Sequence, residues 1–197
     1  LQKLTFRALA RGERRLDQEV RFGISLYTGA NSSDVCPILA GIPPALGNYE
    51  AIFNVYQPLD PIEDTPTAPS LAAAQATLTA VQEAGPKIIV LAADGEPDTC
   101  EVPDPDGQPA ARAESVAAAQ AAHAAGIDVY VISVGDEVSQ GHLQDLANAG
   151  VGLPIGGADE APFYQALDPE ALVAAFDTII GGVQSCTFAL DGSVDLD

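Results

Sequence analysis

Two short apolar stretches decide the fold: KIIVLA at residues 87–92 and IDVYVISV at residues 127–134. Both are dominated by β-branched and other apolar side chains, a pattern typical of strands buried on both faces of a parallel sheet. The Ala-rich segment 110–125 lies between them, is followed by Gly126 and is expected to be a helix. A helix between two buried strands is the usual crossover that joins parallel neighbours. The sequence therefore predicts an α/β protein with a mainly parallel sheet.

The remaining segments extend this alternation in both directions. A strand is expected at 20–27, and an edge strand at 37–42, where the flanking prolines exclude a central position in a sheet. Further elements are expected as helices at 1–19, 48–56, 70–84, 139–148 and 168–180, a short strand at 163–167, and a strand at 185–190. The order predicts a doubly wound, Rossmann-like sheet that is mainly parallel and has one antiparallel edge strand. Neither a repeat nor a linker interrupts this order, so a single domain is expected.

Charge is unevenly distributed along the chain. The 197 residues carry 8 Lys and Arg against 28 Asp and Glu, a net charge of −20. Six of the eight cations lie in the first 21 residues, and residues 22–197 retain only Lys87 and Arg112. Because so acidic a surface repels phosphate, binding to nucleic acid or to an anionic membrane is not expected. Such a surface suits a cation, a basic partner or simple solubility.

Composition places the chain among globular proteins. Hydrophobic residues make up 47% of it, which is enough for a buried core. No apolar run approaches the roughly 18 residues of a membrane span, and no signal peptide is visible at the start. The chain contains no Met, from which we expect that it is processed or is part of a longer protein.

Polar side chains gather where expected strands and helices meet. Asp94 comes directly after the strand at 87–92, and Thr65 and Thr67 precede the helix expected at 70–84. Ligands of open parallel sheets bind beyond the carboxyl ends of the strands, which makes these residues candidates for a binding site. The alternatives are that Asp94 only caps a turn and that the threonines only cap a helix.

The combination of IIVLAADGEPD (88–98) with DTPTAPSLAAA (64–74) resembles the von Willebrand factor A (vWA) domain, whose Rossmann-like sheet carries a metal-ion-dependent adhesion site. RFGISLY (21–27) and IDVYVISVGDE (127–137) look like other strands of the family. The resemblance covers about residues 1–183. It implies that residues 184–197 start a following β segment or a tail.

The site that this resemblance implies bridges a protein ligand through a cation. Thr65 and Asp94 would be metal ligands, and Glu96, Asp98 and Thr67 would be candidates for the rim that meets the ligand. The ion would be Mg²⁺, or Mn²⁺ or Ca²⁺, and Mg²⁺ binds about six oxygens near 2.1 Å. Held by hydroxyls and water-mediated carboxylates, it keeps enough Lewis acidity to bind an exposed carboxylate of the ligand. No enzymatic activity is expected.

The family's remaining ligands are missing from the sequence. Its Asp-x-Ser-x-Ser motif ends the first and central strand of the sheet, and this motif occurs nowhere in the 197 residues. We expect that strand to precede Leu1 in the natural protein, so that residues 1–197 hold an incomplete site. Without a central strand, the two halves of the sheet would be left unjoined.

The resemblance also suggests a pairing for two of the three cysteines. Cys36 follows the strand at 20–27 and Cys100 follows the strand at 87–92, so both would reach the same face. A Cys36–Cys100 disulfide is therefore expected, with two free thiols as the alternative. Cys186 would then have no partner in this chain. This set indicates an oxidising compartment, and the resemblance is to modules of secreted or envelope-associated bacterial proteins.

Other kinds of site find little support. No Gly-x-Ser-x-Gly elbow, Gly-rich phosphate loop or EF-hand occurs, although the loop at 94–106 offers carboxylates for a loosely bound Ca²⁺. His123 and His142 lie in or near expected helices and are interpreted as structural or exposed.

Three functions remain open. The favoured one is a vWA module of a secreted or envelope-associated bacterial protein that binds a protein ligand through a cation, next to an adjacent β domain. The second is a structural or assembly vWA domain with a degenerate metal site. The third is a non-catalytic subunit of an intracellular chelatase-like complex.

Overall fold

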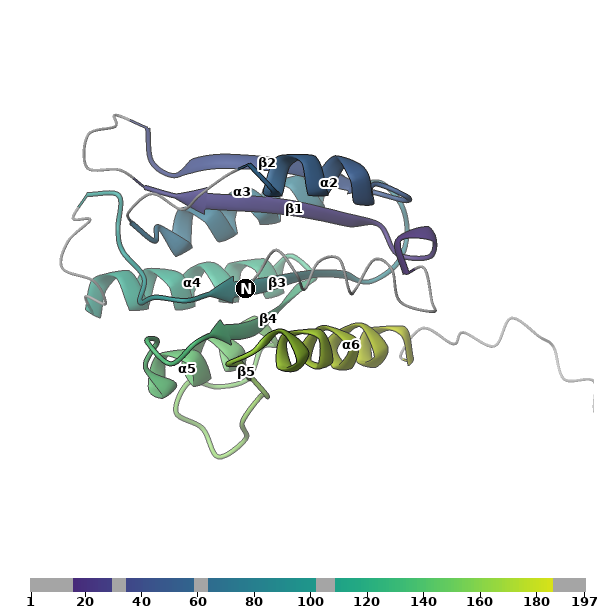
Figure 1. Cartoon of the computed structure of the whole chain (residues 1–197). Helices are drawn as coiled ribbons and strands as arrows, with labels where there is room; N and C mark the ends of the chain where they lie inside the picture. Colours follow the sequence, from purple (N-terminus) through teal and green to yellow (C-terminus); the bar gives the residue numbers. More distant parts are fainter. Residues whose placement is uncertain (1–15, 30–34, 59–63, 102–108, 186–197) are drawn as a thin grey trace, which may run out of the picture.

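The computed structural model describes residues 16–29, 35–58, 64–101 and 109–185 (Figure 1). Its helices and strands alternate for most of the chain, so the α/β class is confirmed. After a short 3-10 turn at Leu16–Gln18, the elements are β1 (Phe22–Thr28), β2 (Ile38–Ala45), α2 (Tyr49–Tyr56), α3 (Thr67–Ala80), β3 (Lys87–Ala93), α4 (Pro109–Ala124), β4 (Ile127–Val134), α5 (Gln140–Gly150), β5 (Tyr164–Ala166) and α6 (Pro169–Ser185).

The two apolar stretches form neighbouring parallel strands, as predicted. β3 pairs with β4 in parallel from Lys87 opposite Ile127 to Ala93 opposite Ser133, and β4 pairs with β5 in parallel. The order of this sheet is β3-β4-β5. Each step needs a crossover because parallel neighbours cannot be joined by a tight turn. α4 makes the first crossover and α5 makes the second.

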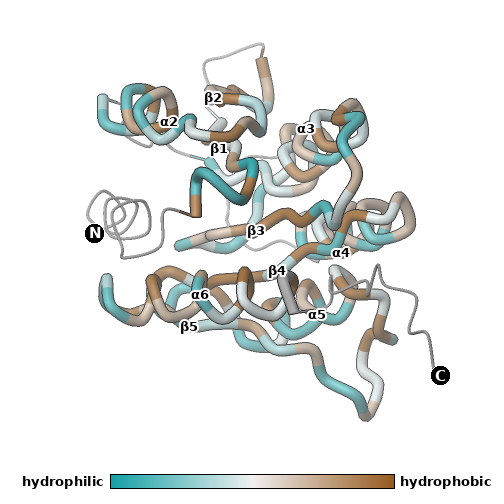
Figure 2. Tube along the Cα trace, turned by 90° about the vertical axis from the view of Figure 1, so that its right-hand side faces the viewer, coloured by the Kyte–Doolittle hydropathy of each residue, from teal (hydrophilic) through white to brown (hydrophobic). Residues whose placement is uncertain are grey.

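Helices cover both faces of the three-stranded sheet. On one face Val129 and Val131 of β4 pack into a core cluster with α3, α4 and α5. On the other face Ile132 packs with α6. Side chains of a strand point alternately to its two faces, so an apolar run serves both clusters. Figure 2 shows α3, α4 and α5 on one side of the strands and α2 and α6 on the other.

β1 and β2 form a separate antiparallel pair. Ile24 lies opposite Ile42 and Thr28 lies opposite Ile38. The predicted edge strand is confirmed, but it extends to Ala45 and so includes Pro43 and Pro44. The register shifts between Phe22 and Ile24, opposite these prolines. Proline has no N–H to donate, and an irregular edge is where a sheet tolerates it.

Within the described residues, the two sheets do not share a hydrogen-bonded strand pair. α3 contacts β1, β2 and β3, so it lies across the seam between them (Figure 1). The structure thus shows a mixed α/β fold with one parallel and one antiparallel sheet.

Several predicted boundaries are wrong by a few residues. The helix expected at 70–84 begins at Thr67 and ends at Ala80, because Val81 has an extended backbone. α6 continues to Ser185 through Gly181 and Gly182, so the predicted strand does not start at 185. The rest of that strand, and most of the helix expected at 1–19, lie outside the described residues. Asp168 caps α6: its carboxylate oxygen accepts the Ala171 N–H at 2.8 Å.

Candidate functional site

The carboxyl end of β1 lies beside the segment that leads into α3. The Gly29 N–H donates to the Asp64 carbonyl oxygen at 3.0 Å, and the Thr28 hydroxyl donates to the same oxygen at 3.3 Å. These bonds form an isolated antiparallel bridge between Gly29 and Asp64. Thr65 follows Asp64 directly, so it is placed next to the end of β1.

The loop after β3 joins the same segment through Asp98. The Thr65 N–H donates to the Asp98 carboxylate at 2.8 Å, and the Asp98 N–H donates to the Thr65 carbonyl at 2.9 Å. Asp98 is only 3% exposed. The two strand ends and the entrance to α3 therefore form one cluster of loops.

The loop that carries Asp94 lies close to Thr65, the other predicted metal ligand. The Thr65 hydroxyl oxygen lies 3.8 Å from the position that a Cβ on Gly95 would take. Asp94 is exposed, whereas Thr65 is half-buried. The Thr65 hydroxyl therefore lies beside Gly95, the residue that follows the exposed Asp94.

Thr67 and Tyr27 lie beneath them. The Thr67 N–H donates to the Thr65 carbonyl at 2.7 Å, and Thr67 is buried. The Tyr27 hydroxyl oxygen is 3.5 Å from the Thr67 hydroxyl oxygen. Burial raises the pKa of Tyr27, the hydrogen bond to Thr67 opposes this, and the charge of Asp94 adds to the rise. Sequence reasoning passed over Tyr27, which looks only like a strand residue.

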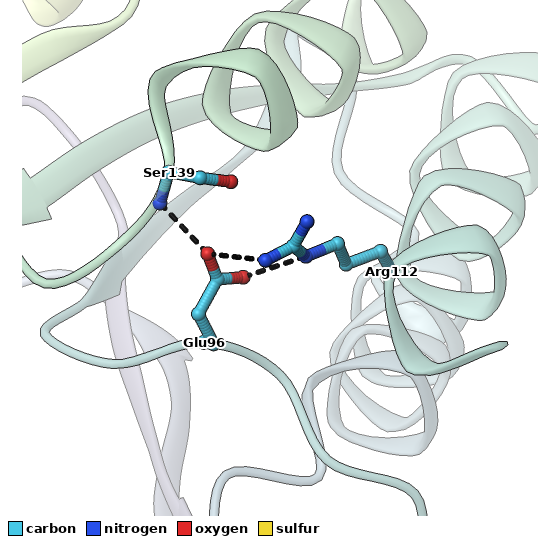
Figure 3. A network of polar contacts seen from close by, with 3 residues as sticks. All are labelled: Glu96, Arg112 and Ser139. Atoms are coloured by element: carbon cyan, nitrogen blue, oxygen red, sulfur yellow. Dashed lines mark hydrogen bonds and ion pairs between the residues drawn. The ribbon is translucent and has the colours of Figure 1, made fainter. Parts of the chain in front are cut away.

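Glu96 points toward Arg112 of α4 and Ser139 at the start of α5 (Figure 3). Its carboxylate accepts Arg112 Nε at 3.0 Å, an Arg112 terminal nitrogen at 2.9 Å and the Ser139 N–H at 2.8 Å. Burial alone would raise the pKa of Glu96, but the bonds from Ser139 and Arg112 outweigh it and lower the pKa. Glu96 thereby caps α5, whose Ser139 makes no side-chain cap of its own.

The three residues predicted to form the rim that meets a ligand do not lie on an open surface in the structure. Asp98 and Thr67 are buried, and Glu96 is committed to Arg112 and Ser139. The sequence placed Glu96 and Asp98 after an expected strand and Thr67 before an expected helix, of which Thr67 is in fact the first residue. It did not show which way each side chain turns, because a loop has no fixed period of side-chain direction.

The predicted Cys36–Cys100 disulfide is confirmed, with 5.5 Å between the two Cα atoms. Cys36 lies just before β2 and Cys100 lies in the loop after β3, so the bond joins the two halves of the fold. Cys186 lies outside the described residues.

The histidines lie apart from Thr65. His123 Nδ1 is 2.8 Å from an Asp128 carboxylate oxygen. His142 is buried near the first turn of α5, and burial lowers its pKa. Glu96 and Asp145 raise that pKa and Arg112 lowers it.

The donor set fits a cation only in part. Thr65 and Asp94 offer two of the roughly six oxygens that Mg²⁺ binds. In the described part of the chain, no three His, Cys, Asp or Glu side chains are grouped so as to hold a metal ion. A complete site would need water, a ligand carboxylate or further donors in addition to these two.

No family model matches the sequence, and neither does any curated protein. Among solved structures, the chain is similar to the pilus adhesin SpaC from Lactobacillus rhamnosus GG. The TM-score is 0.62 over 92% of this chain, with 14% sequence identity. The chain spans 27% of the length of that adhesin. At this identity the likeness shows the fold alone. Among the described helices, none combines the length and the apolar character needed to cross a membrane.

Proposed function

We propose that this chain is a vWA-like module that binds a protein ligand through a divalent cation at the ends of β1 and β3. One observation carries the proposal: the Thr65 hydroxyl lies beside Gly95, the residue that follows the exposed Asp94, at the carboxyl ends of strands from separate parts of the chain. Both residue types suit Mg²⁺, Mn²⁺ or Ca²⁺, which prefer oxygen ligands.

The fold and its likeness support the same proposal. The two sheets, with helices on both faces and α3 across their seam, are compatible with two parts of one doubly wound sheet. The similar structure belongs to a pilus adhesin. Together with the disulfide, which persists in oxidising compartments, this favours an extracytoplasmic adhesion module of a bacterial protein.

Within the site, each residue has a distinct task. Thr65 would offer its neutral hydroxyl, and Asp94 would offer a carboxylate, directly or through water. A cation held this way would be left positive enough to bind the carboxylate of a ligand. The acidic surroundings raise the local concentration of cations. The chain itself supplies no Asp-x-Ser-x-Ser motif, so these two donors are its contribution.

A titration of Mn²⁺ and Mg²⁺ into the natural protein, followed by calorimetry and thermal melting, tests the proposal. We expect binding heat and a raised melting temperature, both lost in Thr65→Ala and Asp94→Ala. Asp136→Ala is the matched control, because Asp136 is also an exposed Asp just after a parallel strand. If the natural protein gives neither heat nor a shift, the proposal fails.

That failure would favour a structural or assembly vWA domain with a degenerate site. One observation already favours this second candidate. The carboxylates of Glu96 and Asp98 are both used for internal hydrogen bonds, as in a site that serves stability.

A further inference from the structure

We propose that Asp98 is a positioning residue, which holds the backbone of Thr65 beside the loop that carries Asp94 without ligating the cation itself. The inference rests on the proposed function and assigns this buried side chain a role in it. Its direct basis is the pair of hydrogen bonds by which Asp98 binds both the N–H and the carbonyl of Thr65.

The peptide groups of Thr65 are fixed on both sides. Its N–H donates to the Asp98 carboxylate at 2.8 Å, a charge-assisted bond of the stronger kind. Its carbonyl accepts the Asp98 N–H at 2.9 Å and the Thr67 N–H at 2.7 Å. With the backbone set in this way, the side chain of Thr65 has little freedom beyond its own rotamer. Asp98 therefore determines where the Thr65 hydroxyl lies.

The loop that carries Asp94 is fixed by the same residue and by Glu96. Glu96 holds it to α4 and α5 through Arg112 and Ser139. Asp98 holds it to the entrance of α3, the helix that lies across the seam. Asp94 precedes both anchors in the loop, so a shift at either one would move it relative to Thr65. A binding site gains affinity when its donors are already in place before the ligand arrives.

Burial separates the roles of the two aspartates. Asp94 is exposed, as a ligand to an incoming cation must be. Asp98 is 3% exposed, and one of its carboxylate oxygens is occupied by the Thr65 N–H. A positioning role needs only this acceptor, which the amide oxygen of an asparagine also supplies. A ligand role needs the negative charge.

Two variants, Asp98→Asn and Asp98→Ala, test the role with two measurements on the natural protein. The first is amide hydrogen exchange at Thr65, measured by NMR without added metal. The second is Mn²⁺ affinity, measured by calorimetry. In Asp98→Ala we expect Thr65 exchange to accelerate at least tenfold and Mn²⁺ affinity to fall at least tenfold. In Asp98→Asn we expect a smaller change in both measurements than in Asp98→Ala, because the amide oxygen still accepts the Thr65 N–H although the bond is no longer charge-assisted.

Glu101→Ala is the matched control, because Glu101 is exposed in the same loop. It should leave both measurements unchanged. The proposal is overturned if Asp98→Asn loses as much Mn²⁺ affinity as Asp94→Asn, since the charge of Asp98 would then matter directly. It is also overturned if Thr65 exchange is unaffected in Asp98→Ala. If that variant fails to fold, Asp98→Asn against Asp94→Asn decides.

The two measurements also separate this inference from the proposed function. If wild-type protein does not bind Mn²⁺, the proposed cation site fails and the positioning role in it fails too. Thr65 exchange would still show, independently, whether Asp98 holds the two loops together.

Discussion

The parallel sheet and the antiparallel pair are stabilised in different ways. In β4 the side chains of Val129, Val131 and Ile132 are 0% exposed, packed between α3–α5 and α6. In β1 and β2 no residue is fully buried. The parallel half owes its stability to a core. The antiparallel half must be held in place largely by its contacts with α2 and α3 and by links at its ends.

Those links converge on the candidate site. The Gly29–Asp64 bridge, the Asp98–Thr65 pair and the Cys36–Cys100 disulfide all lie at one end of the molecule. The site therefore lies between the parallel sheet, which has its own core, and the antiparallel pair, which these links hold in place. Its geometry should depend more on these links than on the hydrophobic core. The predictions below test that difference.

Removing the disulfide should have the largest effect, because it is a covalent link between the halves. In the double variant Cys36→Ser/Cys100→Ser, we expect the free energy of unfolding to fall by about 4 kcal/mol, the chain-entropy value for so long a loop. The two cysteines are 64 residues apart in the sequence. Urea unfolding of both proteins at neutral pH measures the difference. A loss below about 1 kcal/mol would mean that the links do not hold the halves in the way described.

The next effect should come from the core, and it should be unequal between the halves. Ile132→Ala in β4 is expected to cost about 3 kcal/mol, because it leaves a cavity in a close-packed cluster. Ile24→Ala in β1 is expected to cost about 1 kcal/mol, because the side chain is only half-buried and water fills the space. Equal losses in urea unfolding would contradict the assignment of the core to the parallel half.

The sequence was sufficient for the elements with a strong pattern. β3 and β4 were predicted within a residue, since long apolar runs between turn signals have few alternatives. The antiparallel edge strand followed from its prolines. The ends of α3 and α6 were missed because helix ends depend on local backbone contacts. Gly181 and Gly182 favour an end, yet α6 passes through them to Ser185.

The candidate site was predictable as a set of neighbours but not as a geometry. That Thr65 lies beside the loop of Asp94 follows from loops at one end of a sheet. Asp98 and Glu96 turn inward because of partners that cannot be recognised from the neighbouring sequence. The partner of Asp98 is the Thr65 peptide group, and the partners of Glu96 are Arg112 and the start of α5. The geometry around the antiparallel pair was harder to predict than the parallel sheet, because few of its residues are fixed by a buried core.

The smallest effect should come from Glu96, which anchors the loop to the parallel half only. At pH 7 we expect Glu96→Gln to lower the free energy of unfolding by about 1 kcal/mol, since Gln still accepts the Ser139 N–H but loses the charge that pairs with Arg112. Glu101→Gln, an exposed change in the same loop, should alter stability far less.

The contribution of Glu96 to the free energy of unfolding should depend on pH. Because the pKa of Glu96 is lowered in the folded protein, its stabilising contribution is fully present above the ordinary glutamate pKa. The contribution is lost as pH falls through the lowered value, where the folded protein takes up the proton. Urea unfolding across the acidic range should therefore show the wild-type and Glu96→Gln curves converging. His142 faces the same pair, and the charge of Glu96 raises its pKa, so part of the gap between the curves reports this interaction. That part also vanishes once Glu96 is protonated. A gap that stayed constant at acidic pH would show that Glu96 acts through shape and packing rather than through its charge.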